Sequence, residues 1–124
     1  MTSLGMRIVR ASVDEVVVEW TAGPQHSQPM GLVHGGVHCA AIETACSIGA
    51  TLSARERDPN TGAVGLENHT SFVRAVRSGR LTATATPITR GRTTQVWEAT
   101  VRDEAQRTIA TGRVRLLCVE RDKM

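Results

Sequence analysis

The sequence predicts an α+β domain in which one long helix packs on an antiparallel sheet. Its 124 residues suit a single domain of ordinary size. Residues 34–55 are apolar nearly all round a helix, which is the pattern of a buried helix. The segments after it are separated by short turns, and one of them alternates cleanly between apolar and polar residues, as in an antiparallel meander.

The region before the helix is expected to form one or two strands and then a loop. Residues 6–21 are rich in valine and alternate in part with polar residues, which favours strand. Residues 23–31 contain two prolines and two glycines and are predicted to be a loop. The sequence DPNTG, which begins at residue 58, predicts the turn that follows the helix at 34–55.

Four strands are expected in the second half of the chain, over residues 63–76, 80–89, 93–103 and 107–120. The short sequences RSG, RGR and EAQ separate them as turns. Within 80–89, strict alternation puts Leu81, Ala83 and Ala85 on one face and three threonines on the other. We therefore expect about five antiparallel strands, with the helix on one face of the sheet.

Composition excludes several classes of protein. The net charge is +3, but the basic residues form no run, and one Phe, two Trp and no Tyr leave little to stack on bases, so nucleic acid is not an expected partner. No stretch approaches the roughly 18 apolar residues of a membrane helix, and no apolar signal-peptide core opens the chain. The three cysteines form no CxxC pair and no metal-ligand spacing. We expect a cytoplasmic protein with free thiols and no metal.

The predicted helix carries a single carboxylate, Glu43, in its middle. A buried charge without a partner costs several kcal/mol, so a half-buried Glu43 is either a tolerated oddity or a reagent. At about 100° per residue, the residues that share its face are small: Gly36, Cys39, Ala40, Cys46, Ser47 and Ala50. Because one sheet covers only one side of a helix, we expect something else to cover this side.

The spacing of several residues resembles that of the hotdog-fold acyl-CoA thioesterases. The matching residues are Gln28, MGLVHGG at 30–36, Glu43 and Ser47, and the segments VGLENHTSFVRAVRSG at 64–79 and GRTTQVWE at 91–98. The nearest group is that of the 4-hydroxybenzoyl-CoA and 1,4-dihydroxy-2-naphthoyl-CoA thioesterases. This resemblance implies one hotdog domain over residues 1–124, with five to six strands wrapped around a central helix. It also implies hydrolysis of an aryl or other small acyl-CoA, with coenzyme A as part of the substrate and no cofactor.

The residues at the helix start suit this chemistry. Gly35 and Gly36 let a substrate approach the backbone closely, and the amides that open a helix are unpaired donors at the positive end of its dipole. We expect the Gly36 amide, with the Gln28 side chain, to polarise the thioester carbonyl. His34 is interpreted as a hydrogen bonder that fixes the loop carrying Gln28, with a role as a base as the alternative.

Glu43 is expected to attack the carbonyl or to activate a water, and the sequence leaves both routes open. Ser47, one turn further on, can orient that carboxylate or the water. Cys39 and Cys46 flank Glu43, but no histidine stands at helical contact spacing to activate a thiol, so they are interpreted as small apolar filler. Phe72 and Met30 are expected to line the acyl pocket.

Seven residues separate Gly36 from Glu43, roughly 10 Å along a helix, so one chain cannot bring both to the same carbonyl. A two-fold dimer, in which the helix start of one chain meets Glu43 of the other, resolves this and covers the open helix face. The resemblance implies the same homodimer, with dimers pairing into a tetramer.

The resemblance also implies where the coenzyme A nucleotide binds. It assigns Arg74, Arg77, Arg92, Thr93 and Thr94 to the phosphates, with Arg90 in the same turn as Arg92. Two other functions stay open at this stage. One is a non-catalytic acyl-CoA binding or sensing protein. The other is a hydratase or dehydratase, which is less favoured because Glu43 has no histidine partner at a suitable spacing.

Overall fold

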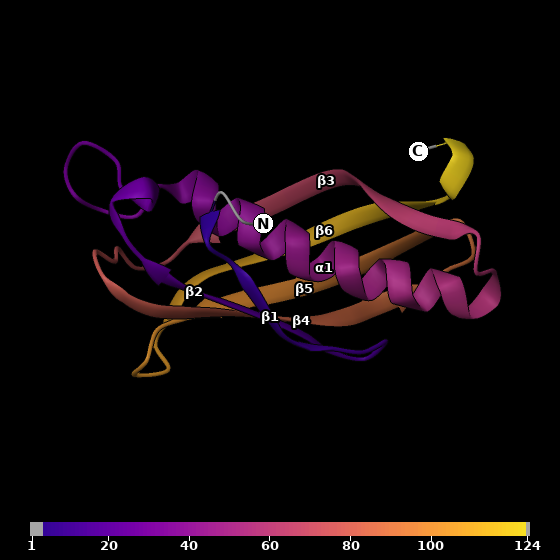
Figure 1. Cartoon of the computed structure of the whole chain (residues 1–124), viewed down its shortest axis with the longest axis horizontal. Helices are drawn as coiled ribbons and strands as arrows, with labels where there is room; N and C mark the ends of the chain where they lie inside the picture. The colour runs from indigo at the N-terminus through magenta and orange to yellow at the C-terminus, as the bar shows by residue number, and fades with distance from the viewer. Residues whose placement is uncertain (1–3, 124) are drawn as a thin grey trace.

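The computed structural model describes residues 4–123 and contains one long helix on a six-stranded antiparallel sheet (Figure 1). The elements are β1 (Arg7–Ala11), β2 (Val16–Ala22), the short 3-10 helix η2 (Pro24–His26), α1 (Gly35–Arg57), β3 (Thr61–Phe72), β4 (Gly79–Arg90), β5 (Thr94–Arg102), β6 (Thr108–Glu120) and the 3-10 helix η3 (Arg121–Lys123). The expected α+β class is confirmed, and the region before the helix forms two strands, so that the sheet has six.

The sheet order is β1-β2-β4-β5-β6-β3, with each strand antiparallel to its neighbours. Strands β1 and β3 therefore lie at the two edges. The alternation predicted for residues 80–89 is confirmed, since Leu81, Ala83 and Ala85 in β4 are fully buried. The strand predicted over 63–76 ends earlier, at Phe72, because the Val73 and Arg74 amides both donate to the Ile109 carbonyl and the regular ladder stops there. Further on, the Val76 carbonyl accepts from the Val33 amide at 2.8 Å, in the loop before α1.

Helix α1 lies along the concave side of the sheet and contacts every strand from β2 to β6 (Figure 1). Its buried residues recur every three or four positions: Val37, His38, Ala41, Ile42, Ala45, Cys46, Gly49, Ala50, Ser53 and Ala54. The opposite side is open, and Glu43 on it is exposed. The expected half-burial of Glu43, and burial nearly all round the helix, are therefore wrong for this chain by itself, because a single sheet covers one side only.

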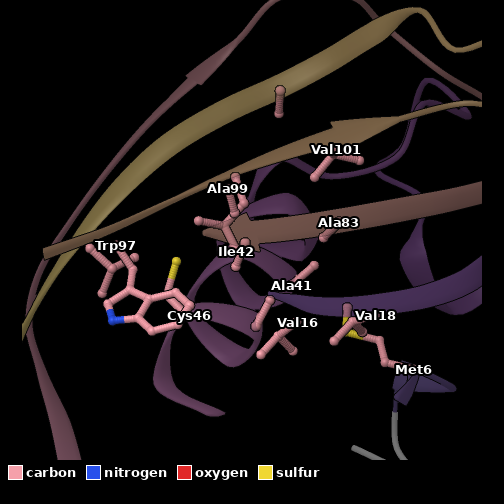
Figure 2. Packing of buried hydrophobic residues seen from close by; sticks show 14 of the residues in the cluster. Met6, Val16, Val18, Ala41, Ile42, Cys46, Ala83, Trp97, Ala99 and Val101 are labelled. Atoms are coloured by element: carbon pink, nitrogen blue, oxygen red, sulfur yellow. The ribbon is translucent and has the colours of Figure 1, made fainter. Parts of the chain in front are cut away.

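The core depends on two buried tryptophans and many small side chains. Figure 2 shows Trp97 among smaller buried side chains of the helix and the sheet. Trp97 on β5 lies so close to α1 that a Cβ at Gly49 would stand 2.4 Å from its ring. Its Nε1 donates to Gln95 Oε1 at 2.8 Å, and Gln95 Nε2 donates to the Ala50 carbonyl at 3.0 Å. This buried polar chain ties the helix to the sheet without leaving an amide group unpaired.

Within residues 4–123, no helix is long and apolar enough to cross a membrane. Over the same residues, no group of histidine, cysteine and acidic side chains is arranged to hold a metal ion.

Candidate active site

The start of α1 is organised by His34. This residue is the N-cap of the helix, and its Nδ1 accepts a hydrogen bond from the Gly36 amide at 2.9 Å. The His34 amide in turn donates to the His26 carbonyl at 2.7 Å. The imidazole thus satisfies one of the amides that a helix start leaves unpaired.

The expectation that the Gly36 amide is an unpaired donor is therefore wrong for this structure. The neighbouring Gly35 amide, in contrast, has no hydrogen-bond acceptor among residues 4–123. A Cβ at Gly35 would lie 2.7 Å from the Phe72 ring, so a side chain there would require that exposed ring to move. Of the two glycine amides, that of Gly35 is therefore the one a bound carbonyl could reach without displacing a protein group.

Gln28 lies in a tight loop held by its own backbone. Its amide donates to the Leu32 carbonyl at 2.7 Å, and its carbonyl accepts from the Gly31 amide at 2.9 Å. Its side-chain Oε1 accepts from the Met30 amide. Because the acceptor end of the side chain is occupied, the Nε2 group, which carries two N–H donors, is the end left for a ligand. The Arg77 guanidinium steadies the same loop by donating to the Met30 carbonyl at 2.9 Å.

A cavity of about 530 Å³ opens at the helix start. Its walls include Gln28, His34 and the two glycines, with Phe72 and Arg74 across from them, and the apolar residues Leu32, Val33, Val73, Ala75 and Val76 complete the lining together with His38. Phe72 therefore lines this cavity, whereas the exposed Met30 does not. Apolar walls with a few convergent polar groups are typical of a small-molecule site.

Glu43 and Ser47 line a separate, open groove of about 670 Å³ on the uncovered side of α1, together with Leu4, Cys39, Ala40, Thr44, Ile48 and Asn68. Gly36 borders both the groove and the cavity at the helix start. The structure thus places the expected residues in two adjoining hollows. Gln28 and His34 lie in one, and Glu43 and Ser47 lie in the other.

Asn68 is a polar contact of Glu43 that the sequence interpretation missed. Its Nδ2 donates to Glu43 Oε1 at 3.3 Å and to the Cys39 carbonyl at 3.0 Å, while its Oδ1 accepts from the Thr70 hydroxyl at 2.6 Å. An asparagine within a strand is unusual, because asparagine is depleted from strands. That composition signal, in the middle of β3, was available in the sequence.

The Cys46 thiol is a poor candidate for a nucleophile. The three cysteines are free, and Cys46 is fully buried. Burial raises the pKa of the Cys46 thiol to about 12, with further contributions from the negative charges of Glu43 and Glu98. Since the thiolate is the reactive form, Cys46 stays an inert, neutral group at physiological pH.

The residues expected to bind coenzyme A phosphates do not lie together in one chain. Arg74 and Arg77 are near the start of α1. Arg92, Thr93 and Thr94 are in or beside the turn between β4 and β5, at the far end of the helix, where Arg57 donates to the Arg90 carbonyl at 3.1 Å. Arg90 and Arg92 line a third cavity there, of about 620 Å³.

Two buried nitrogens beside the helix start have no hydrogen-bond partner among residues 4–123. They are Nδ1 of His38 and Nε1 of Trp20, on rings whose centroids are 6.3 Å apart. Desolvation lowers the pKa of His38, so its imidazole is neutral near pH 7. An unpaired buried polar group costs about 1–3 kcal/mol, which makes this pair a weak point of the core.

Comparisons with known proteins agree with this fold. The model of the thioesterase superfamily matches residues 30–110. The chain is 36% identical to an esterase-named protein of Mycobacterium tuberculosis over 96% of this chain and 85% of that protein. It is 34% identical to a 1,4-dihydroxy-2-naphthoyl-CoA hydrolase of Listeria monocytogenes over 96% of this chain and 88% of the other.

Solved structures show the same relationship. The structure of the Mycobacterium tuberculosis protein superposes with a TM-score of 0.90 over 96% of this chain and 94% of that one, at 36% identity. A thioesterase structure from Haemophilus influenzae superposes with a TM-score of 0.89 at 32% identity, over 97% of this chain and 82% of the other. The chain therefore belongs to the thioesterase superfamily, has the hotdog fold of that family, and is a thioester hydrolase.

Proposed function

We propose that the chain hydrolyses an aryl or other small acyl-CoA to the free acid and coenzyme A. The observation that carries this proposal is Glu43, a carboxylate in an open groove that adjoins a cavity with free N–H donors. The similarity to a 1,4-dihydroxy-2-naphthoyl-CoA hydrolase supports an acyl-CoA substrate with an aromatic acyl group. The largely apolar cavity beside Phe72 suits such a group.

In the proposed mechanism, the thioester carbonyl binds at the helix start. The Gly35 amide and Gln28 Nε2 donate to its oxygen and stabilise the oxyanion of the tetrahedral intermediate. The Gly36 amide joins them where the His34 ring turns away. In one route Glu43 attacks the carbonyl carbon, the coenzyme A thiolate leaves, and water hydrolyses the resulting mixed anhydride to release the acid. In the other, Glu43 removes a proton from a water that attacks the carbonyl, and the thiolate leaves from the tetrahedral intermediate. Ser47 orients the carboxylate or the water.

The active unit is proposed to be a two-fold homodimer, and two such dimers pair into a tetramer. Glu43 stands about 10 Å from the start of its own helix, so the partner's helix start must supply the carbonyl site. The open face of α1 continues onto β3, a twelve-residue edge strand with one side unpaired. Such an edge is a template for pairing with a second chain.

The dimer also explains the split set of phosphate residues. If Glu43 of one chain meets the helix start of the other, the first chain's helix end projects about 20 Å beyond that start. Arg92, Thr93 and Thr94 of the first chain then lie along the direction in which the coenzyme A tail would run, while Arg74 and Arg77 come from the second chain. Coenzyme A is thus proposed to bridge both chains.

The first test is replacement of the carboxylate. Glu43→Gln is expected to lower kcat for the best acyl-CoA substrate by at least about 100-fold, because the base or nucleophile is lost. Thiol release from benzoyl-type and fatty acyl-CoA would be followed with a thiol-reactive dye. Glu98→Gln, which removes the charge of an exposed carboxylate on β5, is the matched control. If Glu43→Gln hydrolyses its best substrate at the wild-type rate, the assignment is wrong.

A further inference from the structure

A one-residue bulge interrupts β3 directly beside Glu43. Gly65 pairs with Leu116 and Glu67 pairs with Arg115, so Leu66 between them has no partner on β6. Side chains alternate between the two faces of a strand. One extra residue therefore moves every later side chain to the opposite face.

The contacts with α1 follow this change of face. Before the bulge, the odd-numbered residues face the helix: the Ala63 amide donates to the Thr51 hydroxyl at 3.2 Å, and Gly65 lies against Glu43. After the bulge, even-numbered residues do so, and Asn68 contacts the helix while its neighbour Glu67 is exposed.

Without the bulge, Glu67 would occupy the position on the helix face next after Gly65. Two carboxylates would then lie side by side, since Gly65 already contacts Glu43. Such a pair repels, and one member takes up a proton. With the bulge, an amide donor takes this position in place of the second acid.

We propose that Asn68 is the positioning residue of the Glu43 carboxylate, and that the bulge at Leu66 puts it on the helix face. This inference rests on the proposed function of Glu43. Asn68 is itself fixed, because the Thr70 hydroxyl donates to its Oδ1 at 2.6 Å and thereby sets which end of the amide faces Glu43. Its Nδ2 then serves Glu43 Oε1 and the Cys39 carbonyl together.

Gly65 lies against the carboxylate oxygen that Asn68 does not contact. A Cβ at Gly65 would lie 3.0 Å from Glu43 Oε2, closer than a side chain normally stands. One carboxylate oxygen is thus bonded by the Asn68 amide, and the other lies over bare backbone. This arrangement restricts rotation of an exposed side chain and keeps Oε2 available for a water or a thioester carbon.

The decisive variant is Asn68→Ala, with Glu67→Ala as the matched control on the adjacent residue. Asn68→Ala is expected to lower kcat by about 10- to 100-fold with little change in KM, because the carboxylate loses its alignment and the substrate cavity is untouched. Glu67→Ala is expected to keep the wild-type kcat. Melting temperatures of both variants would show whether either change acts through folding.

A second variant, Asn68→Asp, places a negative charge at residue 68 and tests whether this residue lies next to the Glu43 carboxylate. It should move the acid limb of the pH profile of kcat upward by about one pH unit or more, since a second carboxylate then stands beside Glu43. Among residues 4–123, Cys39 lines the same groove as Glu43, the Glu43 charge acts on Cys46, and on β3 the exposed Glu67 lies on the face of the strand away from the helix. Cys46, with its pKa raised to about 12, does not titrate in the range measured.

The outcomes separate this inference from the proposed function. If Asn68→Ala keeps the wild-type kcat and Asn68→Asp leaves the acid limb in place, the positioning role is overturned while Glu43 can still be catalytic. Should Glu43→Gln remain active, the proposed function fails. In that case the pH titration of the Glu43 side-chain carboxyl signal by ¹³C NMR still tests the contact, which is overturned if Asn68→Asp leaves that titration unchanged.

Discussion

At the scale of single residues, the buried side-chain nitrogens that lack a hydrogen-bond partner among residues 4–123 belong to two rings near the helix start. His38 is 4% exposed and Trp20 is 2% exposed, and one nitrogen of each lacks a partner. Phe72 lies on the other side of His38, with ring centroids 6.3 Å apart. An imidazole enclosed by aromatic rings is held neutral, so its protonation is coupled to unfolding.

This coupling predicts a loss of stability in mild acid. The pKa of His38 is lowered from 6.5 in the folded chain. Above that ordinary value, neither state binds the proton and folding is unaffected. As the pH falls below it, the unfolded chain takes up a proton that the folded chain resists, so the free energy of unfolding decreases until the lowered pKa is reached.

His38→Leu is expected to reduce this loss, and to be at least as stable as the wild type at pH 7.5 because it removes an unpaired polar group. The measurement is the free energy of unfolding in urea at pH 7.5 and 5.5, at one protein concentration. His69→Gln, which removes an exposed histidine, should keep the wild-type difference between the two pH values. Equal losses in wild type and His38→Leu would contradict the assignment.

At the scale of elements, small residues decide how closely α1 meets its surroundings. On the buried side of α1, the missing side chain of Gly49 makes room for the Trp97 ring. On the other side, the small residues Gly36 and Ala40 line the groove that holds Glu43. Gly35 serves a third contact, with Phe72. Helix propensity alone would disfavour each glycine, so their presence indicates close approach.

In Gly49→Ala, the higher helix propensity of alanine is opposed by crowding of the new Cβ against the Trp97 ring. Alanine in place of glycine stabilises a helix interior by roughly 0.5–1 kcal/mol, but overpacking a core typically costs about 1–3 kcal/mol. A Cβ would stand 2.4 Å from a ring that is itself fully buried, so packing should win. The expected result is a net destabilisation of about 1–2 kcal/mol in urea unfolding.

The same substitution in a Trp97→Phe background is the control. The smaller ring removes the close contact, so Gly49→Ala should then cost less than it does in the wild type, or stabilise. An equal cost in both backgrounds would show that the ring contact is not responsible.

The sequence was sufficient to locate the helix and the strands, but not to predict which residues of β3 face the helix. Hydrophobic periodicity located α1 and the alternating strand β4 because each has a clear repeat. The bulge at Leu66 has no such signal, and it alone decides that Asn68 rather than Glu67 faces the helix. Likewise, the HGG spacing pointed to the helix start, but the ring of His34 decides which glycine amide stays free.

At the scale of the whole molecule, one side of the fold remains open. Among residues 4–123, the sheet buries one face of α1, the opposite face carries the groove that holds Glu43, and β3 lies at a free edge of the sheet. Composition predicted this opening, since a helix apolar nearly all round needs cover on two sides. A second copy of the chain is the proposed occupant, because it would also complete the proposed site.

The shared site can be tested by mixing two inactive variants. Gln28→Ala damages the carbonyl site of its own chain, and Glu43→Gln removes the carboxylate that its chain offers to the partner. In a mixed dimer, one site combines an intact Gln28 with an intact Glu43, and the other site carries both changes. Random exchange of subunits, driven by brief dilution and reconcentration, should therefore restore about a quarter of the wild-type activity. Sedimentation before and after mixing checks that dimers form. If the mixture stays as inactive as either variant while dimers exchange, each chain holds its site alone.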